Sequence, residues 1–298
     1  MNLLKNLALT AALHNLAKGN GRRIILWHHD LAWTTPRYRF ELHDGYPWDL
    51  LRQAWPGVRQ VTISEMRQQE LADLFDISPD EILVVPNGMD VARFHKFEKQ
   101  TCAYIKQLGL LRSAPLLLLP VRITPRKNIE LALHVCASLI EHFPDTKLVV
   151  TGPLGPHNPT NIHYFERLIS LRQELGLAEV VHFLAELTSD YIADEVIYDF
   201  YHLADALFMP SREEGFGIPV LEAGLAGLPV FCSDIPPLRS LAGSDAVYFS
   251  QDADPHQLAR TIADALSSNP VFRLRAHVRR HYTWERVYAE RIAPLLAE

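Results

Sequence analysis

Two glutamates with a fixed spacing are the residues whose types most clearly suggest chemistry. Glu214 and Glu222 have seven residues between them and follow the apolar run Ala206–Met209, which predicts a buried strand. A loop after such a strand lies at the carboxyl edge of a sheet, where open α/β sheets bind ligands. Gly215 and Gly217 let the backbone approach a ligand and present its N–H groups. The carboxylates could serve one ligand, one at its reacting end and one accepting hydroxyl hydrogens from a diol; alternatively, both are solvated beside an ordinary turn.

The residues around Glu222 predict a helix that begins in this loop. Pro219 suits a first helical turn, and Gly227 is typical of a helix end. The N–H groups and positive dipole end of such a helix favour an anion. The sequence therefore predicts an anionic group, such as a phosphate, next to the glutamates.

A second cluster, Arg122 and Lys127, follows the apolar run 116–120 and opens another predicted helix. The two cations are five residues apart across a turn that carries Pro125. Such cations suit a diphosphate, with Arg as a planar fork and Lys as a point charge. The alternative is a basic turn in water. Because the net charge of the chain is −6, any phosphate must be held by a local site of this kind.

A pair of histidines, His28 and His29, follows the apolar run 24–27. A histidine at the carboxyl end of a strand can donate to a ligand or transfer a proton. The alternative is a local hydrogen-bonding pair. A metal site is less favoured, because no third or fourth ligand occurs at a suitable spacing.

The elements that must position these residues are short apolar runs alternating with amphipathic segments of helical length. The runs do not alternate between polar and apolar residues, which predicts strands buried on both faces of a parallel sheet. We therefore predict an α/β, doubly wound fold. The predicted strands are residues 24–27, 60–63, 82–85, 116–121, 147–150, 180–184, 206–209, 229–232 and 246–249, and the clearest helices are residues 128–142 and 162–175.

Composition narrows the function classes. The 298 residues are 48% hydrophobic and 21% charged, and no block of Lys and Arg occurs, so we expect no nucleic-acid partner and see no sign of peripheral membrane association. Three distant cysteines make neither a disulfide framework nor a Cys-x-x-Cys site. The apolar run at residues 3–9 is interrupted by Lys5 and Asn6 and predicts neither a membrane span nor a signal peptide. A cytoplasmic protein is expected.

A turn signal at residues 85–90 separates about three predicted strands from about six. Before it, the segment 33–55 is rich in Pro, Tyr, Trp and charges and predicts a long irregular connection. Long connections of this kind are often functional.

The run from Glu214 to Ala223, Glu-Gly-Phe-Gly-Ile-Pro-Val-Leu-Glu-Ala, resembles the E-x7-E signature of glycosyltransferase family 4, a retaining family with the GT-B fold of two Rossmann-like domains. Other segments resemble the family in the same order, from about residue 60 to the end of the chain. They are residues 85–90, Arg122 with Lys127-Asn128, residues 148–152, residues 181–184, Tyr201 with Ala204-Asp205, residues 209–211 and Tyr282-Thr283-Trp284.

The resemblance implies a retaining glycosyltransferase, which moves a hexose from a nucleotide-diphosphate sugar to an unknown glycan, lipid or small-molecule acceptor. It implies a partial N-terminal, acceptor-side domain at residues 1–93 and a donor-binding domain at residues 94–280. A helix at residues 281–298 would pack back toward the N-terminal domain. The family needs no metal or other cofactor, and Asp252-Ala253-Asp254 before Pro255 indicates a helix start rather than a metal site.

The resemblance also implies roles for individual residues. Arg122 and Lys127 would neutralise the diphosphate, and Glu222 would take the ribose hydroxyls. Glu214, with the N–H groups of the glycine loop, would hold the sugar and stabilise charge without attacking it, and His29 would contact the sugar. The implied donor-binding residues are Arg122, Lys127, Gly215, Phe216, Gly217 and Glu222.

The chain departs from the family pattern at Val121 and Ala185, where glycines are usual, and it reaches His29 without the first strands and the Gly-rich loop. Either the true start lies upstream, or the protein is naturally short. A partial sheet exposes strand edges, which invites an oligomer or a partner chain. The alternatives to an enzyme are therefore a non-catalytic nucleotide-sugar-binding or partner subunit and, less favoured, a sugar-nucleotide epimerase.

Overall fold

The computed structural model describes residues 6–19, 23–154 and 159–297, so residues 3–5 of the first apolar run lie outside it. Within the described residues, no helix is long and apolar enough to cross a membrane. The expected cytoplasmic location remains a prediction. Contacts divide the chain into two compact units, which we call the N-terminal unit (Met1–Met89 with His281–Glu298) and the C-terminal unit (Asp90–Arg280).

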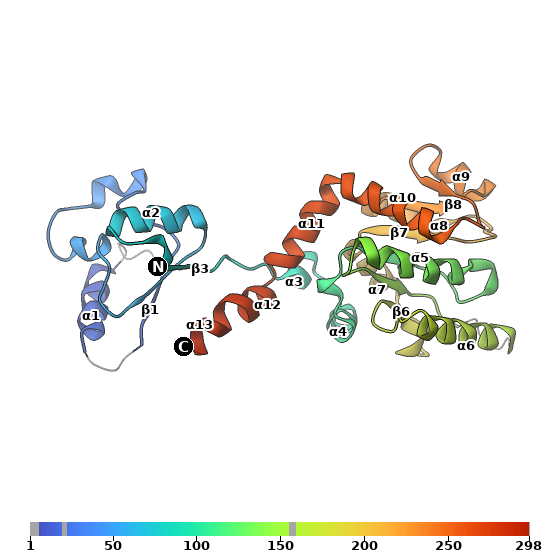
Figure 1. The fold of residues 1–298 in the computed structure, drawn as a ribbon, viewed down its shortest axis with the longest axis horizontal. Helices are drawn as coiled ribbons and strands as arrows, with labels where there is room; N and C mark the ends of the chain where they lie inside the picture. The colour runs from blue at the N-terminus through green and yellow to red at the C-terminus, as the bar shows by residue number, and fades with distance from the viewer. Residues whose placement is uncertain (1–5, 20–22, 155–158, 298) are drawn as a thin grey trace. The chain divides into compact units, whose positions relative to one another are not determined.

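A six-stranded parallel sheet forms the centre of the C-terminal unit (Figure 1). The hydrogen-bonded order of its strands is β6-β5-β4-β7-β8-β9. Strands β4, β6, β7 and β8 are buried at every residue. Both faces of the sheet are therefore covered, which explains why these strands are continuous apolar runs. The strands are β4 (Leu116–Leu119), β5 (Lys147–Val150), β6 (Val181–Phe183), β7 (Ala206–Met209), β8 (Val230–Ser233) and β9 (Val247–Phe249).

Helices flank this sheet, and local sequence signals set their ends. Helix α8 has Pro219 in its first turn and ends at Gly227, whose φ is 71°. The side chain of Asp254 caps α10 by accepting from the N–H of Gln257 at 2.9 Å, which confirms the predicted helix start. The helical elements are α3 (Val91–His95), α4 (Lys99–Leu108), η5 (Leu110–Arg112), η6 (Pro125–Lys127), α5 (Ile129–His142), α6 (Pro159–Glu174), η7 (Leu184–Glu186), α7 (Asp194–Leu203), α8 (Ile218–Ala226), α9 (Pro236–Ala242), α10 (Pro255–Ser268) and α11 (Pro270–His281).

The order of the strands creates a topological switch point between β4 and β7. The chain adds β5 and β6 on one side of β4 and then returns to pair β7 with the other side of β4. Open α/β sheets bind ligands outside the carboxyl ends of the strands at such a point. The loop after β4 (residues 120–128) and the loop after β7 (residues 210–217) border it, so the two clusters predicted from the sequence become neighbours.

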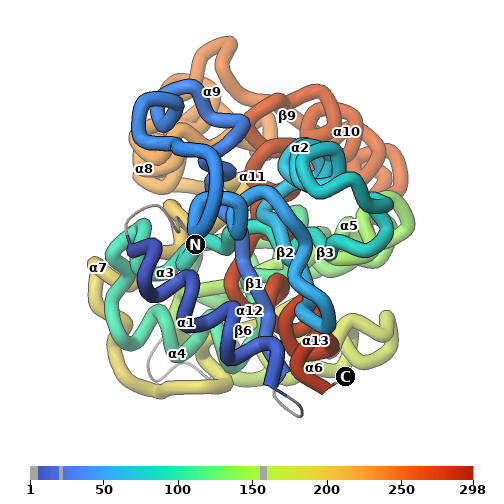
Figure 2. Tube along the Cα trace, turned by 90° about the vertical axis from the view of Figure 1, so that its left-hand side faces the viewer, coloured from blue at the N-terminus to red at the C-terminus, as the bar shows by residue number. Residues whose placement is uncertain are grey.

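The N-terminal unit contains a three-stranded parallel sheet, and Figure 2 shows its strands side by side in the order β1-β2-β3. The connection from β1 to β2 is irregular, as predicted for residues 33–55, apart from two short 3-10 turns. The elements before residue 89 are α1 (Leu7–Ala17), β1 (Ile25–His28), η2 (Pro36–Glu41), η3 (Trp48–Leu51), β2 (Arg59–Thr62), α2 (Glu65–Phe75), η4 (Pro79–Glu81) and β3 (Ile82–Val84).

The last residues of the chain are built into the N-terminal unit. The N–H of Met89 donates to the carbonyl of Tyr282 at 2.5 Å, and the N–H of Trp284 donates back to the carbonyl of Met89 at 3.2 Å. Val287 packs against Val61 in one buried cluster. This C-terminal segment consists of α12 (Trp284–Val287), the π-helical turn η8 (Tyr288–Ile292) and α13 (Ala293–Ala297).

The predicted fold class is confirmed, since both units are α/β with parallel sheets flanked by helices. All nine predicted strands are present, with ends shifted by two residues at most. The three strands before the turn signal and the six after it form separate sheets. The domain limits at residues 93 and 280 remain a prediction.

Candidate functional site

The loops at the switch point are joined to one another by hydrogen bonds. The N–H of Arg212 donates to the carbonyl of Arg126 at 2.8 Å, and the guanidinium of Arg126 donates to the carbonyl of Glu213 at 3.3 Å. The side chain of Asn128 accepts from the guanidinium of Arg212 at 3.2 Å and donates to the carbonyl of Gln251 at 3.1 Å. The loops after β4, β7 and β9 therefore form one connected rim.

Lys127 and Glu214 form an ion pair inside this rim. The Nζ atom of Lys127 lies 2.5 Å from Oε1 of Glu214, and the side chains are 8% and 7% exposed. The hydroxyl of Ser211 donates to the same oxygen at 2.7 Å. The nearest cation to Oε2 is Nη1 of Arg126, at 3.9 Å. One carboxylate oxygen of Glu214 is thus fully engaged, while the other has no close donor in the described part of the chain.

Of the two cations predicted to meet a phosphate, Lys127 is paired within the described residues and Arg122 is not. Burial lowers the pKa of Lys127 below its usual range, the carboxylate of Glu214 opposes this shift, and nearby Arg122 adds to it. Because Lys127 is already paired, it adds little net charge. Arg122 is exposed, and its guanidinium has no partner among residues 6–19, 23–154 and 159–297. Arg122 is therefore the cation of this pair that can meet an anion without first losing a partner.

The glycine loop presents backbone N–H groups beside these charges. Gly217 has a φ of 104°, and a methyl group on it would lie 2.6 Å from Cδ2 of Leu238, so both the backbone conformation and the packing require glycine. A methyl group on Gly215 would meet nothing within 4 Å. In the described chain, the N–H groups of Phe216 and Gly217 have no backbone acceptor, and α8 begins at the next residue. This arrangement suits an anion.

Glu222 is positioned by a neighbouring helix. Its Oε2 atom accepts from the hydroxyl of Tyr201 at 2.5 Å. Burial and the carboxylate of Glu222 together raise the pKa of the Tyr201 hydroxyl, which keeps this group a donor at neutral pH. Among the described residues nothing donates to Oε1, so this oxygen is free to accept from a ligand hydroxyl.

A close backbone contact holds the loop that carries Arg122. A methyl group on Gly152 would lie 1.9 Å from the carbonyl oxygen of Val121, so the chain after β5 must be glycine there. The N–H of Ile123 donates to the carbonyl of Pro153 at 3.2 Å. The three atoms nearest to such a methyl group are backbone atoms of Val121 and Arg122, so the close contact does not involve the valine side chain.

The sequence predictions gave no role in the site to Arg126, Ser211 and Tyr201, each of which lies close to a glutamate carboxylate. Ser211 stands three residues before Glu214, so its position in the motif was a usable signal. The partners of Arg126 and Tyr201 follow from which elements lie side by side, and this is not visible in residue spacing.

The predicted histidine pair lies in the N-terminal unit. Nε2 of His28 is 2.9 Å from Oε1 of Gln60, and burial lowers the pKa of His28 to about 4. His28 is therefore a neutral, buried residue at pH 7, and its hydrogen-bond partner lies on the neighbouring strand β2 rather than beside it in the sequence. His29 is exposed and has no hydrogen-bond partner in the described chain. Its contact with a donor sugar remains a prediction.

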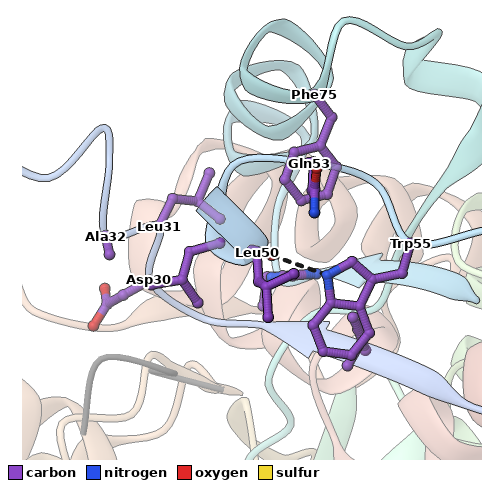
Figure 3. Close-up of a pocket in the computed structure, with 10 residues that line it drawn as sticks. Asp30, Leu31, Ala32, Leu50, Gln53, Trp55 and Phe75 are labelled. Carbon is purple, nitrogen blue, oxygen red and sulfur yellow. Dashed lines mark hydrogen bonds between the residues drawn. The ribbon is translucent and has the colours of Figure 1, made fainter. Parts of the chain in front are cut away.

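A cavity of about 20 Å³ is lined by residues at the end of β1, by the loop that follows and by α2 (Figure 3). The indole N–H of Trp55 donates to the carbonyl of Leu50 at 2.9 Å, and the carboxylate of Asp30 points away from Trp55. This volume holds about one water molecule. The cavity is therefore too small to receive a sugar or a nucleotide.

Comparison with known proteins agrees with this geometry. A family model described as "Glycosyl transferases group 1" matches residues 103–281, more than half of the chain. The chain is 32% identical over 230 residues to a D-inositol 3-phosphate glycosyltransferase of Frankia alni, covering 70% of this chain and 54% of the relative. It is 30% identical over 242 residues to the protein of the same name from Geodermatophilus obscurus, covering 79% of this chain and 51% of the relative.

The chain thus spans about half the length of the curated relatives that it matches. Among solved structures, the crystal structure of Anabaena Alr3699/HepE in complex with UDP is similar to it, with 18% identity and a TM-score of 0.48. This likeness covers 99% of the chain and 77% of the Anabaena protein.

Proposed function

Because the chain belongs to the glycosyl transferases group 1 family, we propose that it transfers a hexosyl group from a nucleotide-diphosphate sugar to an acceptor. One observation carries the proposal. Within the described residues, the loops at the switch point between β4 and β7 carry Arg122 without an ion-pair partner and two backbone N–H groups without acceptors. They also carry Glu214, and helix α8 carries Glu222, each with one carboxylate oxygen that accepts no hydrogen bond there. Cations and N–H groups suit a diphosphate, and free carboxylate oxygens suit sugar hydroxyls.

In this proposal the donor is held by both loops at once. Arg122, Lys127 and the N-terminus of α8 meet the diphosphate and the charge that builds up on it as the sugar leaves. The free oxygen of Glu222 accepts from a ribose hydroxyl. Glu214 and the N–H groups of the glycine loop hold the sugar. These groups neutralise the leaving group themselves, so the proposed step needs no metal ion.

We further assign the chain to glycosyltransferase family 4, with retention of configuration, on the spacing of Glu214 and Glu222. The bond from the anomeric carbon to the diphosphate oxygen breaks, and a bond to an acceptor oxygen forms on the same face of the sugar. The acceptor proton passes to the departing diphosphate. Glu214 then positions the sugar and stabilises its charge, and His29 is assigned a contact with the sugar on the family resemblance alone.

We take our first choice of acceptor class from the names of the relatives. Their printed name, D-inositol 3-phosphate glycosyltransferase, makes a phosphorylated polyol our preferred class. A non-catalytic nucleotide-sugar-binding subunit is the second candidate, since the family match of residues 103–281 lies almost wholly in the C-terminal unit.

The test combines turnover with binding. The purified chain is incubated with UDP-, GDP- and ADP-sugars and with candidate acceptors, and released nucleoside diphosphate and new glycoside are measured. We expect one nucleotide class to support transfer, with the anomeric configuration of the donor kept in the NMR spectrum of the product. An inverted product would rule out the retaining assignment, and binding without release from any donor would favour the non-catalytic subunit.

Tyr201→Phe tests whether the hydroxyl that holds Glu222 matters for the donor. Losing this one hydrogen bond should weaken binding of a ribonucleoside diphosphate about fivefold, near 1 kcal/mol, by releasing the Glu222 carboxylate. The KM for the donor should rise by the same factor with kcat unchanged. Calorimetric titration and initial rates measure both quantities.

Two controls separate this role from a general packing effect. Tyr198→Phe, on the same helix but exposed, should leave donor affinity unchanged. A 2′,3′-dideoxynucleoside diphosphate lacks the hydroxyls that Glu222 would bind, so the Tyr201→Phe variant should bind it as well as the unchanged protein does. An equal loss for both nucleotides would show that Tyr201 supports only the fold.

A further inference from the structure

The irregular segment between β1 and β2 is fixed by its own indole rings. The Nε1 atoms of Trp33 and Trp48 donate to the carbonyls of Trp48 and Glu41 at 3.3 and 3.1 Å. The Nε1 atom of Trp55 donates to the carbonyl of Leu50 at 2.9 Å. Each indole thus ties two parts of the same segment together. The segment between β1 and β2 is therefore a preformed surface, although it is built from turns and short 3-10 helices.

Arg52 joins three residues of the same segment by ion pairs and by stacking on a ring. Its guanidinium lies 4.3 Å from the centre of the Trp33 ring and 2.5 Å from a carboxylate oxygen of Asp49. It also lies 3.3 Å from a carboxylate oxygen of Asp44, and the N–H of Gly45 donates to Asp49 at 3.3 Å. Arg52 therefore offsets the acidic side chains of the segment and stacks on Trp33.

A hollow of about 430 Å³ lies wholly within this segment. Its volume falls in the range of small-molecule sites, and it follows β1 at the carboxyl edge of the sheet. Its polar and aromatic lining comprises Trp33, Thr34, Thr35, Arg39, His43 and Asp44. The lining thus combines a cation, a carboxylate, an imidazole, two hydroxyls and an aromatic ring.

Arg39 gives the hollow its preference for an anion. The neighbouring Arg37, on the same 3-10 turn, is paired with Asp30 at 2.7 Å. In the part of the chain that the structure describes, the exposed guanidinium of Arg39 has no such partner. A lone guanidinium in a hollow matches the geometry of a phosphate.

We propose that the hollow lined by Trp33, Arg39 and Asp44 binds a phosphorylated polyol. Arg39 binds the phosphate, and Asp44 and the hydroxyl of Thr34 bind ring hydroxyls. The ring of Trp33 takes up the C–H surface of the polyol. Identifying this ligand as the acceptor rests on the proposed function, whereas the binding itself does not.

The test measures binding to the full chain without any donor. Inositol 1-phosphate, free inositol and inorganic phosphate are titrated into the protein by calorimetry. Tryptophan fluorescence provides a second signal. We expect inositol 1-phosphate to bind at least tenfold more tightly than either free inositol or inorganic phosphate. Arg39→Ala should weaken its binding at least tenfold.

Arg37→Ala is the matched control, because it removes an equal charge from the same turn but does not line the hollow. It should change affinity less than twofold, whereas equal losses in both variants would overturn the proposal.

Vesicles containing phosphatidylinositol identify the source of the ligand. Arg39-dependent binding to vesicles alone would assign a lipid headgroup, and binding of the free phosphate ester would assign a small molecule. If neither the free phosphate ester nor the vesicles showed binding that depends on Arg39, the proposed site would be overturned. Transfer activity enters none of these measurements, so the failure of this site is distinguishable from failure of the proposed transferase.

Discussion

Lys127→Ala should abolish measurable transfer and weaken binding of the nucleoside diphosphate about 10- to 100-fold. A charge-assisted hydrogen bond is worth roughly 1.5–3 kcal/mol, which corresponds to a loss of this size. The substitution also leaves the carboxylate of Glu214 buried without its partner, since both side chains are more than nine-tenths buried. Removing one member of a buried pair costs about 3–5 kcal/mol. Part of the effect will therefore be lost stability, measured by thermal unfolding beside calorimetric binding.

Two further variants separate the binding role of Lys127 from its structural role. Lys127→Met combined with Glu214→Gln removes both charges, so it should recover much of the lost stability while nucleotide binding stays weak. Glu214→Gln alone leaves Lys127 without a competing carboxylate. This variant should bind the nucleoside diphosphate at least as tightly as the unchanged protein but transfer sugar poorly. If binding recovered together with stability in the double variant, Lys127 would have only a structural role.

The fold could be predicted because a short run of neighbouring residues in the sequence is enough to indicate each strand. Leu116–Leu119 and Ala206–Met209 are short, continuous apolar runs, and such runs are typical of strands buried on both faces. Gly227 and Asp254 mark helix ends through backbone conformation and capping, which depend only on neighbours in sequence. The class and the number of strands therefore follow from patterns a few residues long.

The pairing of the site residues could not be predicted, because it depends on strand order. Lys127 and Glu214 lie 87 residues apart, and they meet only because β7 inserts beside β4 rather than beside β6. Tyr201 reaches Glu222 because α7 packs against α8. Spacing showed that these residues belong near one sheet edge. It did not show that Lys127 would pair with Glu214, whereas Arg122 has no ion-pair partner in the part of the chain that the structure describes.

A second buried ion pair lies at the amino ends of β4 and β7, whereas the candidate site lies at their carboxyl ends. Asp205 is fully buried before β7 and accepts from the N–H of Leu116 at 2.8 Å. It also forms a short ion pair with Arg279 on α11. Arg279 in turn donates to the carbonyl of Leu203 at 3.2 Å, and Arg275 lies 3.9 Å from the second oxygen of Asp205. Asp205 thus ties α11 to the start of the central strands.

Asp205→Ala should lower the stability of the C-terminal unit by about 3–5 kcal/mol, because it leaves a buried guanidinium and a backbone N–H without their acceptor. For a unit of this size the loss corresponds to a fall in Tm of roughly 10 °C, measured by calorimetry. Asp205→Asn keeps an acceptor for Leu116 but loses the charge, so its Tm should lie between the two. The control is Asp234→Ala, which breaks an exposed pair with Arg239 of equally good geometry and should leave the Tm unchanged. Equal shifts at positions 205 and 234 would mean that burial does not determine the contribution of the pair, and Asp205 would then not be the anchor of α11.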